Sequence, residues 1–432
     1  MGSNHVDRLS NMPDEVLSEI LSLMPTKFAV RTSILSKRWR YNWTLVTNID
    51  IDDSHPYHDL KIFSTFVDRV LGLCKTTEIR LFRLRCMQIW VQKSSVSKWI
   101  DEAVRLNVSE LDIHVMLLEL PLSLFTCKTL TKLKIESNKY WDIMDWQTPF
   151  NLPCVKTLDV AVFCNPSRNA FKLIRGCPVL ESLSLDIAAC SAPEEECRFD
   201  IPTLKQLKLT TFKGCNFKKV VLNVPNLDDL FIAGPWHSLF VMEDLSSLVS
   251  VTYSLSVMDH LLVELLKGII GAKSLSFRTT NYMKDLPGVP LLNLPNLKHL
   301  ELTDDGYKFE QIIIFKFLES CSELEHLSIK TAQVRWGNEP ESCWFKPHIV
   351  PACMLKTLRT MKYENCKWRK DDIKFLEYML RNAEVLKTLT VTCKSELLEE
   401  QMRLCAKLLK CPRASRYCEI HFVGKSFESA SS

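Results

Sequence analysis

One pattern of hydrophobic positions recurs along most of the chain, from residue 108 onward. Each copy reads apolar-x-x-apolar-x-apolar, and most of the apolar positions are leucine. Successive copies begin 21 to 27 residues apart over most of the chain, and the last two intervals are 31 residues each. The copies begin at Val108, Leu130, Val155, Leu180, Leu204, Leu227, Leu248, Ala272, Leu297, Leu324, Leu355 and Leu386.

The spacing within each copy predicts a short β-strand. The fourth and sixth positions lie two residues apart, so both side chains point to the same face of a strand, toward the core. One repeat cannot bury that face alone, but stacked repeats bury it jointly. Intervals of about 20–29 residues are typical of leucine-rich repeats, and intervening stretches such as 309–319 are predicted to be helical. Ordinary alternating strands are the competing interpretation, which twelve spaced copies disfavour.

Residues 9–45 have the periodicity of three short helices instead. Pro13 suits the first helical position, where a missing N–H costs nothing, and acidic residues after it complement the helix dipole. Pro25 is expected to end the first helix, and Thr26 and Ser36 are expected to cap the next two. The first helix has apolar residues on more than one face, namely Val16, Leu17, Ile20, Leu21 and Met24.

A unit of about forty residues buries too little surface to be stable alone. Its apolar helix faces must be buried by the rest of the chain or by a partner protein. The run from Leu9 to Lys27, continued from Ala29 to Arg40, resembles an F-box. Met12 and Met24 stand where that family usually has leucine before proline, and both exchanges roughly conserve volume.

The resemblance to an F-box implies docking to a Skp-type adaptor, which links the protein to a cullin. For Val16, Leu17 and Trp39, the alternative is that they only hold the three helices together. The adaptor contacts that the resemblance implies, by matching position, are Met12, Pro13, Ile20, Leu21, Leu23, Pro25, Lys27, Val30, Leu35 and Trp39.

Residues 351–423 depart from the repeat interval and resemble the FBD domain that follows the repeats in many plant F-box proteins. A helix is expected over 371–382, where Ile373, Leu376 and Met379 recur at helical spacing. The turn at 365–368 lacks a glycine that is usual in that domain. Physically, this segment can cap the solenoid, since a terminal repeat must hide its open apolar end.

The expected fold class is α/β, with five parts along the chain. A three-helix F-box is followed by an irregular leucine-rich-repeat solenoid with a parallel β-sheet, which an FBD segment caps. The expected boundaries are 5–50 for the F-box, 51–105 for a connecting region with helices at 60–73 and 94–105, 106–350 for the repeats, 351–423 for the FBD segment and 424–432 for a flexible tail.

Composition argues against several functions. The net charge of +4 is spread along 432 residues, whereas a nucleic-acid binder usually concentrates its cations. Seventeen cysteines include no Cys-x-x-Cys pair, so neither a metal nor a cofactor is expected. Paired carboxylates, a nucleophile elbow and phosphate-binding glycine loops are missing, so we expect no enzyme. The polar N-terminus and short apolar stretches predict no membrane partner and a cytoplasmic or nuclear location.

Outward positions of the predicted strands are candidates for contact with a target protein. Nearly all of them are polar with mixed charges, so the clustered cations that a phosphate-rich ligand requires are not apparent. Phe231 is an exception, and with Trp236 it can form an aromatic anchor, although local packing is the alternative. The candidate target-binding residues are Phe231, Trp236, Lys208, Glu301 and Arg359.

The resemblance therefore implies the substrate-recognition subunit of an SCF (Skp–cullin–F-box) E3 ubiquitin ligase. It would hold a target protein whose identity the sequence leaves open. The alternative is a leucine-rich-repeat scaffold or small-molecule sensor without a ligase role.

Overall fold

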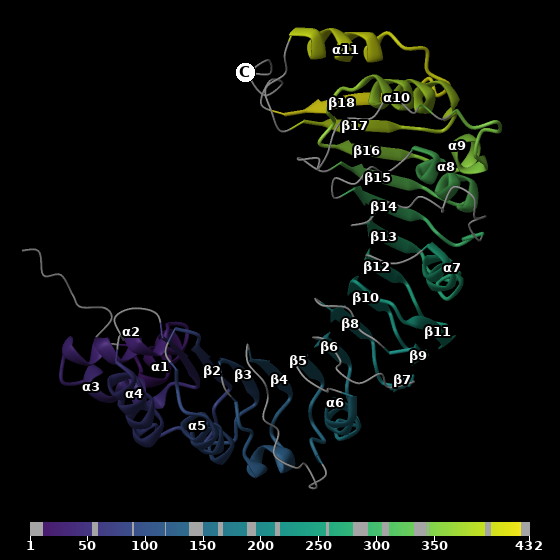
Figure 1. Cartoon of the computed structure of the whole chain (residues 1–432). Coiled ribbons are helices and arrows are strands. Elements are labelled where there is room, and N and C mark those ends of the chain that lie inside the picture. The colour runs from purple at the N-terminus through teal and green to yellow at the C-terminus, as the bar shows by residue number, and fades with distance from the viewer. Residues whose placement is uncertain are drawn as a thin grey trace, which may run out of the picture. The chain divides into compact units, whose positions relative to one another are not determined.

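The computed structural model forms two compact units, Met1–Ala192 and Pro193–Ser432, which are described separately (Figure 1). The structure describes residues 12–53, 59–88, 90–116, 118–137, 150–162, 167–187, 196–211, 217–255, 259–279, 293–304, 311–331, 344, 346–393 and 399–424.

The first unit begins with the predicted short helices. They are α1 (Asp14–Ser22), α2 (Thr26–Arg31), η1 (Thr32–Ile34), α3 (Trp39–Asn42) and η2 (Trp43–Leu45). Arg38, not Ser36, is the N-cap residue of α3, but the Ser36 Oγ accepts a hydrogen bond from the first N–H of that helix, at Trp39, at 3.3 Å. The prediction for Thr26 was wrong: Thr26 is the first helical residue, and its hydroxyl accepts from the Asp50 N–H of the next strand at 2.8 Å.

A parallel sheet follows these helices, with its strands in chain order. The strands are β1 (Asn48–Asp52), β2 (Leu81–Cys86), β3 (Glu110–Val115), β4 (Lys132–Ser137), β5 (Thr157–Val162) and β6 (Ser182–Ile187). The connections contain α4 (Leu60–Leu73), α5 (Lys93–Arg105), η3 (Leu122–Thr126) and α6 (Ser167–Arg175). Leu111 pairs with Leu133, and Ile113 with Ile135, and all four side chains are buried as the repeat pattern predicts.

The sheet begins earlier than the repeat pattern indicated. Strands β1 and β2 lie before the first predicted repeat, and β2 falls in the segment that we expected only to connect. Both strands keep the spacing of the later repeats, and the buried positions are Val46, Ile49 and Ile51 for β1 and Ile79, Phe82 and Leu84 for β2. They were missed because the repeats were recognised by leucine, which occupies only one of these six positions. The two helices expected in that segment are confirmed as α4 and α5.

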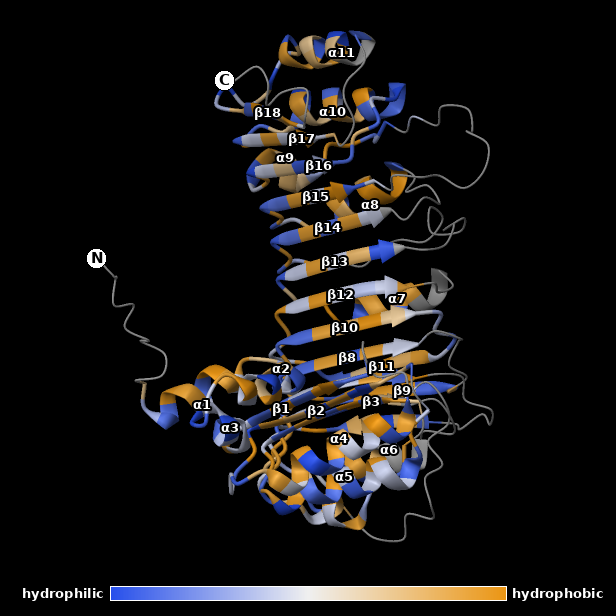
Figure 2. Cartoon of the chain, turned by 90° about the vertical axis from the view of Figure 1, so that its left-hand side faces the viewer, coloured by the Kyte–Doolittle hydropathy of each residue, from blue (hydrophilic) through white to orange (hydrophobic). Residues whose placement is uncertain are grey.

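The main strands of the second unit are also parallel and in chain order. Figure 2 shows several of them, with their beginnings coloured as hydrophilic. They are β8 (Gln206–Thr211), β10 (Asp229–Gly234), β12 (Ser250–Leu255), β13 (Ser274–Thr279), β14 (His299–Asp304), β15 (His326–Lys330), β16 (Thr360–Glu364), β17 (Thr388–Thr392) and β18 (Glu419–Val423). The helices are α7 (Asp259–Lys267), α8 (Gln311–Ser320), α9 (Ala352–Lys356), α10 (Lys370–Asn382) and α11 (Glu399–Leu409). The described part of the predicted 309–319 helix is confirmed as α8.

A separate three-stranded parallel sheet lies in the same unit, and the sequence pattern did not predict it. It consists of β7 (Glu196–Asp200), β9 (Lys219–Asn223) and β11 (Leu239–Asp244), in the order β11-β9-β7. These strands occupy connections between the main strands, where helices were the expectation. Each contains alternating apolar residues, such as Cys197 and Phe199, which are buried. That alternation was the available signal.

One repeat was assigned in the wrong frame. We placed a copy at Leu355, whereas the strand that follows it is β16, with Met361 and Tyr363 paired to Leu327 and Ile329. The copy therefore begins at Leu358, which is fully buried. Leu355 lies instead in the short helix α9.

The C-terminal segment confirms the predicted helix as α10, and its start is secured by one carboxylate. Asp372 accepts from the Arg369 N–H at 3.1 Å and from the Tyr363 hydroxyl at 2.9 Å, which joins α10 to β16. The turn that lacks glycine takes a left-handed backbone at two residues, Asn365 and Trp368, with φ of 57° and 56°. Asn365 tolerates this conformation, and its side chain donates to the Thr331 carbonyl at 3.0 Å.

Candidate docking surfaces

Helix α1 has two apolar faces with different environments. Leu17 and Leu21 lie four residues apart on the face that packs into the unit, where they are 0% and 1% exposed. Val16, Ile20 and Leu23 recur at spacings of four and three residues, so they share a second face, roughly 110° around the helix from the first. All three are exposed, and Leu23 reaches 79%. Figure 2 shows hydrophobic colour along α1.

The helical unit is fixed to the first strand through polar contacts on its inner side. The Lys27 ammonium lies 3.0 Å from the Asp52 carboxylate of β1, and the lysine side chain is only 12% exposed. The Ser22 hydroxyl accepts from the Thr47 N–H at 3.1 Å. With the Thr26 contact described above, these interactions hold α1 and α2 against the sheet. The chain itself therefore buries one helical face and leaves the other open.

The predicted adaptor contacts fall into three groups by exposure. Leu21 and Trp39 are buried in the unit, so their side chains are not available on its surface. Met12, Pro25, Lys27 and Val30 are half-buried, and Lys27 is already paired. The exposed members of the set are Pro13, Ile20, Leu23 and Leu35. Five further exposed apolar residues of the helical unit were not in the set: Val16, Phe28, Ile34, Tyr41 and Leu45. The helical spacing of Val16 with Ile20 was the signal that could have found the first.

The exposed face of the strands in the first unit carries charges that compensate one another. Asp50, Arg83 and Asp112 are directly paired across β1, β2 and β3. The Arg83 guanidinium lies 2.8 Å from Asp112 and 3.3 Å from Asp50, and the hydrogen bond to Asp112 raises the pKa of Arg83. The next two strands continue the alternation, with Lys134 3.2 Å from Asp159. This face is therefore largely satisfied by its own residues.

The exposed face of the main strands in the second unit has hydroxyl side chains at half of the positions in its middle row. Its middle row, read through the strand register, is Lys208, Phe231, Thr252, Ser276, Glu301, Ser328, Lys362 and Thr390. Three predicted target contacts lie in this row. The Lys208 ammonium is 5.8 Å from the centre of the half-buried Phe231 ring, and Glu301 accepts from Ser276 at 3.3 Å.

Two predicted target contacts lie elsewhere. Trp236 is 1% exposed, donates its indole N–H to the Ala233 carbonyl at 2.9 Å and packs edge-on against Phe240. It is a core residue, so the proposed surface pair with Phe231 does not exist. Arg359 is exposed but precedes β16, because the repeat frame was misplaced, and Lys362 takes the middle-row position.

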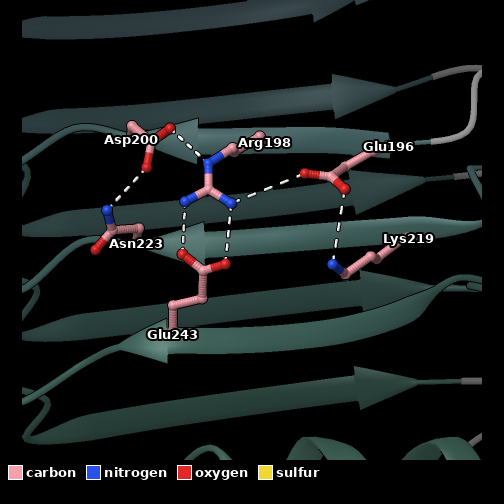
Figure 3. A network of polar contacts seen from close by, with 6 residues as sticks. All are labelled: Glu196, Arg198, Asp200, Lys219, Asn223 and Glu243. Carbon is pink, nitrogen blue, oxygen red and sulfur yellow. Dashed lines mark hydrogen bonds and ion pairs between the residues drawn. The ribbon is translucent and has the colours of Figure 1, made fainter.

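The three-stranded sheet of the second unit is joined by one arginine (Figure 3). Arg198 on β7 lies 2.7 Å from Asp200 and makes a two-pronged contact with Glu243 on β11. Because β9 lies between β7 and β11, this side chain crosses the middle strand, where Val221 is fully buried. The hydrogen bond from the Arg198 guanidinium holds the pKa of Glu243 below its usual value. The network links the three strands and leaves no open site at Arg198.

The described residues show little that would support metal binding or thiol chemistry. Among them, no group of three or more histidine, cysteine or acidic side chains is arranged to hold a metal ion. The described cysteines are free, and burial raises the pKa of thiols such as Cys353, to about 12, which disfavours the reactive thiolate. None of the described helices has both the length and the apolar character needed to cross a lipid bilayer.

Three family models match separate parts of the chain. The F-box domain matches residues 9–47, the repeats of the FBD-associated F-box protein At5g56370 match residues 96–251, and the FBD domain matches residues 346–391. The first and last agree with the parts of the chain that carry the two resemblances described above.

Proteins of Arabidopsis thaliana are similar along most of the chain. The F-box/LRR-repeat protein At4g14103 is 32% identical, over 77% of this chain and 87% of its own length. The F-box/FBD/LRR-repeat protein At5g56420 is 28% identical, over 96% of this chain and 99% of its own. The FBD-associated F-box protein At4g10400 is also 28% identical, over 96% of this chain and all of its own length.

Proposed function

The chain belongs to the plant F-box/FBD/LRR-repeat family, and from this premise we propose that it is the substrate-recognition subunit of an SCF E3 ubiquitin ligase. In this role the helical unit binds a Skp-type adaptor, which connects the protein to a cullin. The exposed face of the repeats holds a target protein. The protein catalyses nothing itself; it raises the local concentration of the target beside a ubiquitin-charged enzyme.

The observation that carries this proposal is the exposed apolar face of α1. Val16, Ile20 and Leu23 share that face, and Leu35 after η1 is also exposed. A contiguous apolar surface on a soluble protein marks an interaction site when it is not explained by burial in the chain. Here the inner face of the same helix already packs into the unit, so folding alone does not account for the outer one.

The decisive experiment is a pull-down of the full chain with a purified Skp-type adaptor, comparing wild type with Leu23→Asp combined with Leu35→Asp. Both side chains are exposed, so the substitutions should leave the fold intact. A charge in the apolar centre of an interface should weaken binding by at least about 100-fold, which is a typical loss at an interface hot spot.

The matched control is Leu122→Asp, which makes the same chemical change at an exposed leucine of η3, outside the helical unit. It should bind the adaptor as the wild type does. If the folded wild type fails to bind any Skp-type adaptor, the ligase proposal fails and the scaffold or sensor alternative takes its place. Equal loss in the control and the double variant would remove the α1 face from the proposal.

A further inference from the structure

Stacking of the repeats aligns five charged residues that are far apart in sequence. Each stands directly after the first apolar residue of a repeat and is joined to the next by a backbone hydrogen bond. Lys298 N donates to Lys273 O, Glu325 N to Lys298 O, Arg359 N to Glu325 O and Lys387 N to Arg359 O, at 2.7–2.9 Å. We call Lys273, Lys298, Glu325, Arg359 and Lys387 the strand-start row. Each member directly precedes its strand, and consecutive members precede neighbouring strands, which lie about 4.8 Å apart.

The strand-start row is strongly cationic, with four basic residues and one carboxylate. Lys298 lies 2.7 Å from Glu325 and holds the pKa of that carboxyl below its usual value. Lys273, Arg359 and Lys387 are exposed, and within the described residues their side chains form no ion pair. The acidic residues at the margins are Glu419, after Lys387, and Glu301, in the middle row.

A second line of polar groups lies beside this row, one residue further along each strand. It consists of Ser274, His299, His326, Thr360 and Thr388, which are paired in register. The two imidazoles stack with their centres 4.5 Å apart. His326 Nδ1 lies 2.6 Å from the Thr360 hydroxyl, and burial, with His299 nearby, lowers the pKa of His326. Hydroxyls and imidazoles are good partners for phosphate oxygens.

Two of the four neighbouring pairs in the row are like-charged and oppose folding, whereas Glu325 is opposite in charge to both Lys298 and Arg359. Like charges on directly neighbouring strands destabilise a sheet, and the row places Lys273 beside Lys298 and Arg359 beside Lys387. The first unit avoids this cost, because Asp50, Arg83 and Asp112 alternate in sign. Departures from alternating charge between neighbouring strands are expected where a surface binds a partner.

We propose that the strand-start row binds an acidic, phosphorylated, extended segment of the target protein. The proposal rests on the proposed function and specifies the chemistry of the target. Four steps of about 4.8 Å span roughly 19 Å, which equals the length of about six extended residues. The row has no Trp, Tyr or Phe on which bases would stack, which disfavours single-stranded RNA. Charge-assisted hydrogen bonds to phosphate are the strongest contacts that such a row offers.

The test measures fluorescence anisotropy of the full chain with a labelled acidic peptide that carries two phosphoserines. The same peptide with unmodified serines and an RNA oligonucleotide of equal charge are run in parallel. The variant is Lys273→Gln, Arg359→Gln, Lys387→Gln, and its matched control is Lys356→Gln, Lys410→Gln, Arg416→Gln, three exposed cations outside the row. Losing three cationic contacts should weaken phosphopeptide binding roughly 30-fold, while the control stays within about threefold of wild type.

Adaptor pull-down of both variants separates this proposal from the proposed function, because the row lies outside the helical unit. The proposal is supported if the row variant loses the phosphopeptide and retains the adaptor. No phosphopeptide binding by the wild type, equal binding of the unmodified peptide, equal loss in both variants, or tighter binding of the RNA would each overturn it. A wild type that binds the phosphopeptide but no adaptor would refute the ligase role and keep the cationic site.

Discussion

The apolar face of α1 and the strand-start row are two exposed surfaces of opposite chemistry. On α1, Val16, Ile20 and Leu23 expose hydrocarbon on a helix whose inner face is fully packed. In the second unit, Lys273, Arg359 and Lys387 expose charge directly before strands whose inward residues are fully packed. Each surface lies next to a well-formed core, so in neither case does poor folding explain the exposure.

The contrast indicates two modes of association. An apolar face gains its affinity from removing water, which changes little with salt. A cationic row gains affinity and speed from charge, which salt screens. The first mode suits a stable complex with a constant adaptor. The second suits a target that becomes recognisable when it is phosphorylated, and that is released when the phosphate is lost.

The largest expected effect is the difference in stability between charge substitutions on the buried and on the exposed face of α1. Leu21→Asp places a charge at a side chain that is 1% exposed, and it should cost the helical unit more than about 4 kcal/mol of stability. Leu23→Asp, at 79% exposure, should change stability by less than about 0.5 kcal/mol. Hydrogen exchange of residues 12–47 in the full chain measures both. Equal protection in the two variants would contradict the assignment of the faces.

Salt should distinguish the two surfaces with a smaller effect. Raising the ionic strength from about 0.05 M to 0.3 M shortens the screening length roughly twofold, so phosphopeptide binding should weaken by about tenfold. Adaptor binding through the α1 face should change by less than about twofold over the same range. Titrations at the two salt concentrations provide the test. Equal salt dependence would mean that the two surfaces do not differ in their mode of binding.

The smallest effect compares compensated with uncompensated charge. Arg83→Ala leaves Asp50 and Asp112 facing each other and should cost the first unit about 1 kcal/mol, after allowance for solvent screening. Lys387→Ala removes a repulsive neighbour of Arg359 and should be neutral or slightly stabilising. Urea unfolding with hydrogen exchange of β1–β3 and β16–β17 measures the pair. A destabilising Lys387→Ala would show that the row is needed for folding.

Most of the fold was predictable because its signals are local. The inward residues of the repeat strands, such as Leu133 and Leu300, follow from two-residue alternation, and their burial is confirmed. The helices α4, α5, α8 and α10 follow from helical periodicity. The fold class and the family resemblance are confirmed as well. The predicted tail lies almost entirely outside the described residues, and the boundaries between the parts of the chain stay predictions.

The errors arose where one segment had two plausible local interpretations. Leu355 and Leu358 both fit the start of a repeat, and only pairing of β16 with β15 selects Leu358. Trp236 has the composition of a surface anchor, yet its burial depends on Phe240, a residue of β11 in a sheet that was not expected. Thr26 resembles a cap, but its hydroxyl accepts from Asp50 of β1 instead.

The sequence by itself determined most of the helices and repeat strands and which side of those strands faces the core, because these depend on residues within a few positions of one another. Only the tertiary structure decided which face of α1 stays exposed, since that depends on where β1 lies. It also decided that cations from successive repeats stand side by side. Stacking brings equivalent residues of successive repeats, which are more than 20 residues apart in sequence, to about 4.8 Å from one another. Charges that are scattered in sequence thereby form one surface.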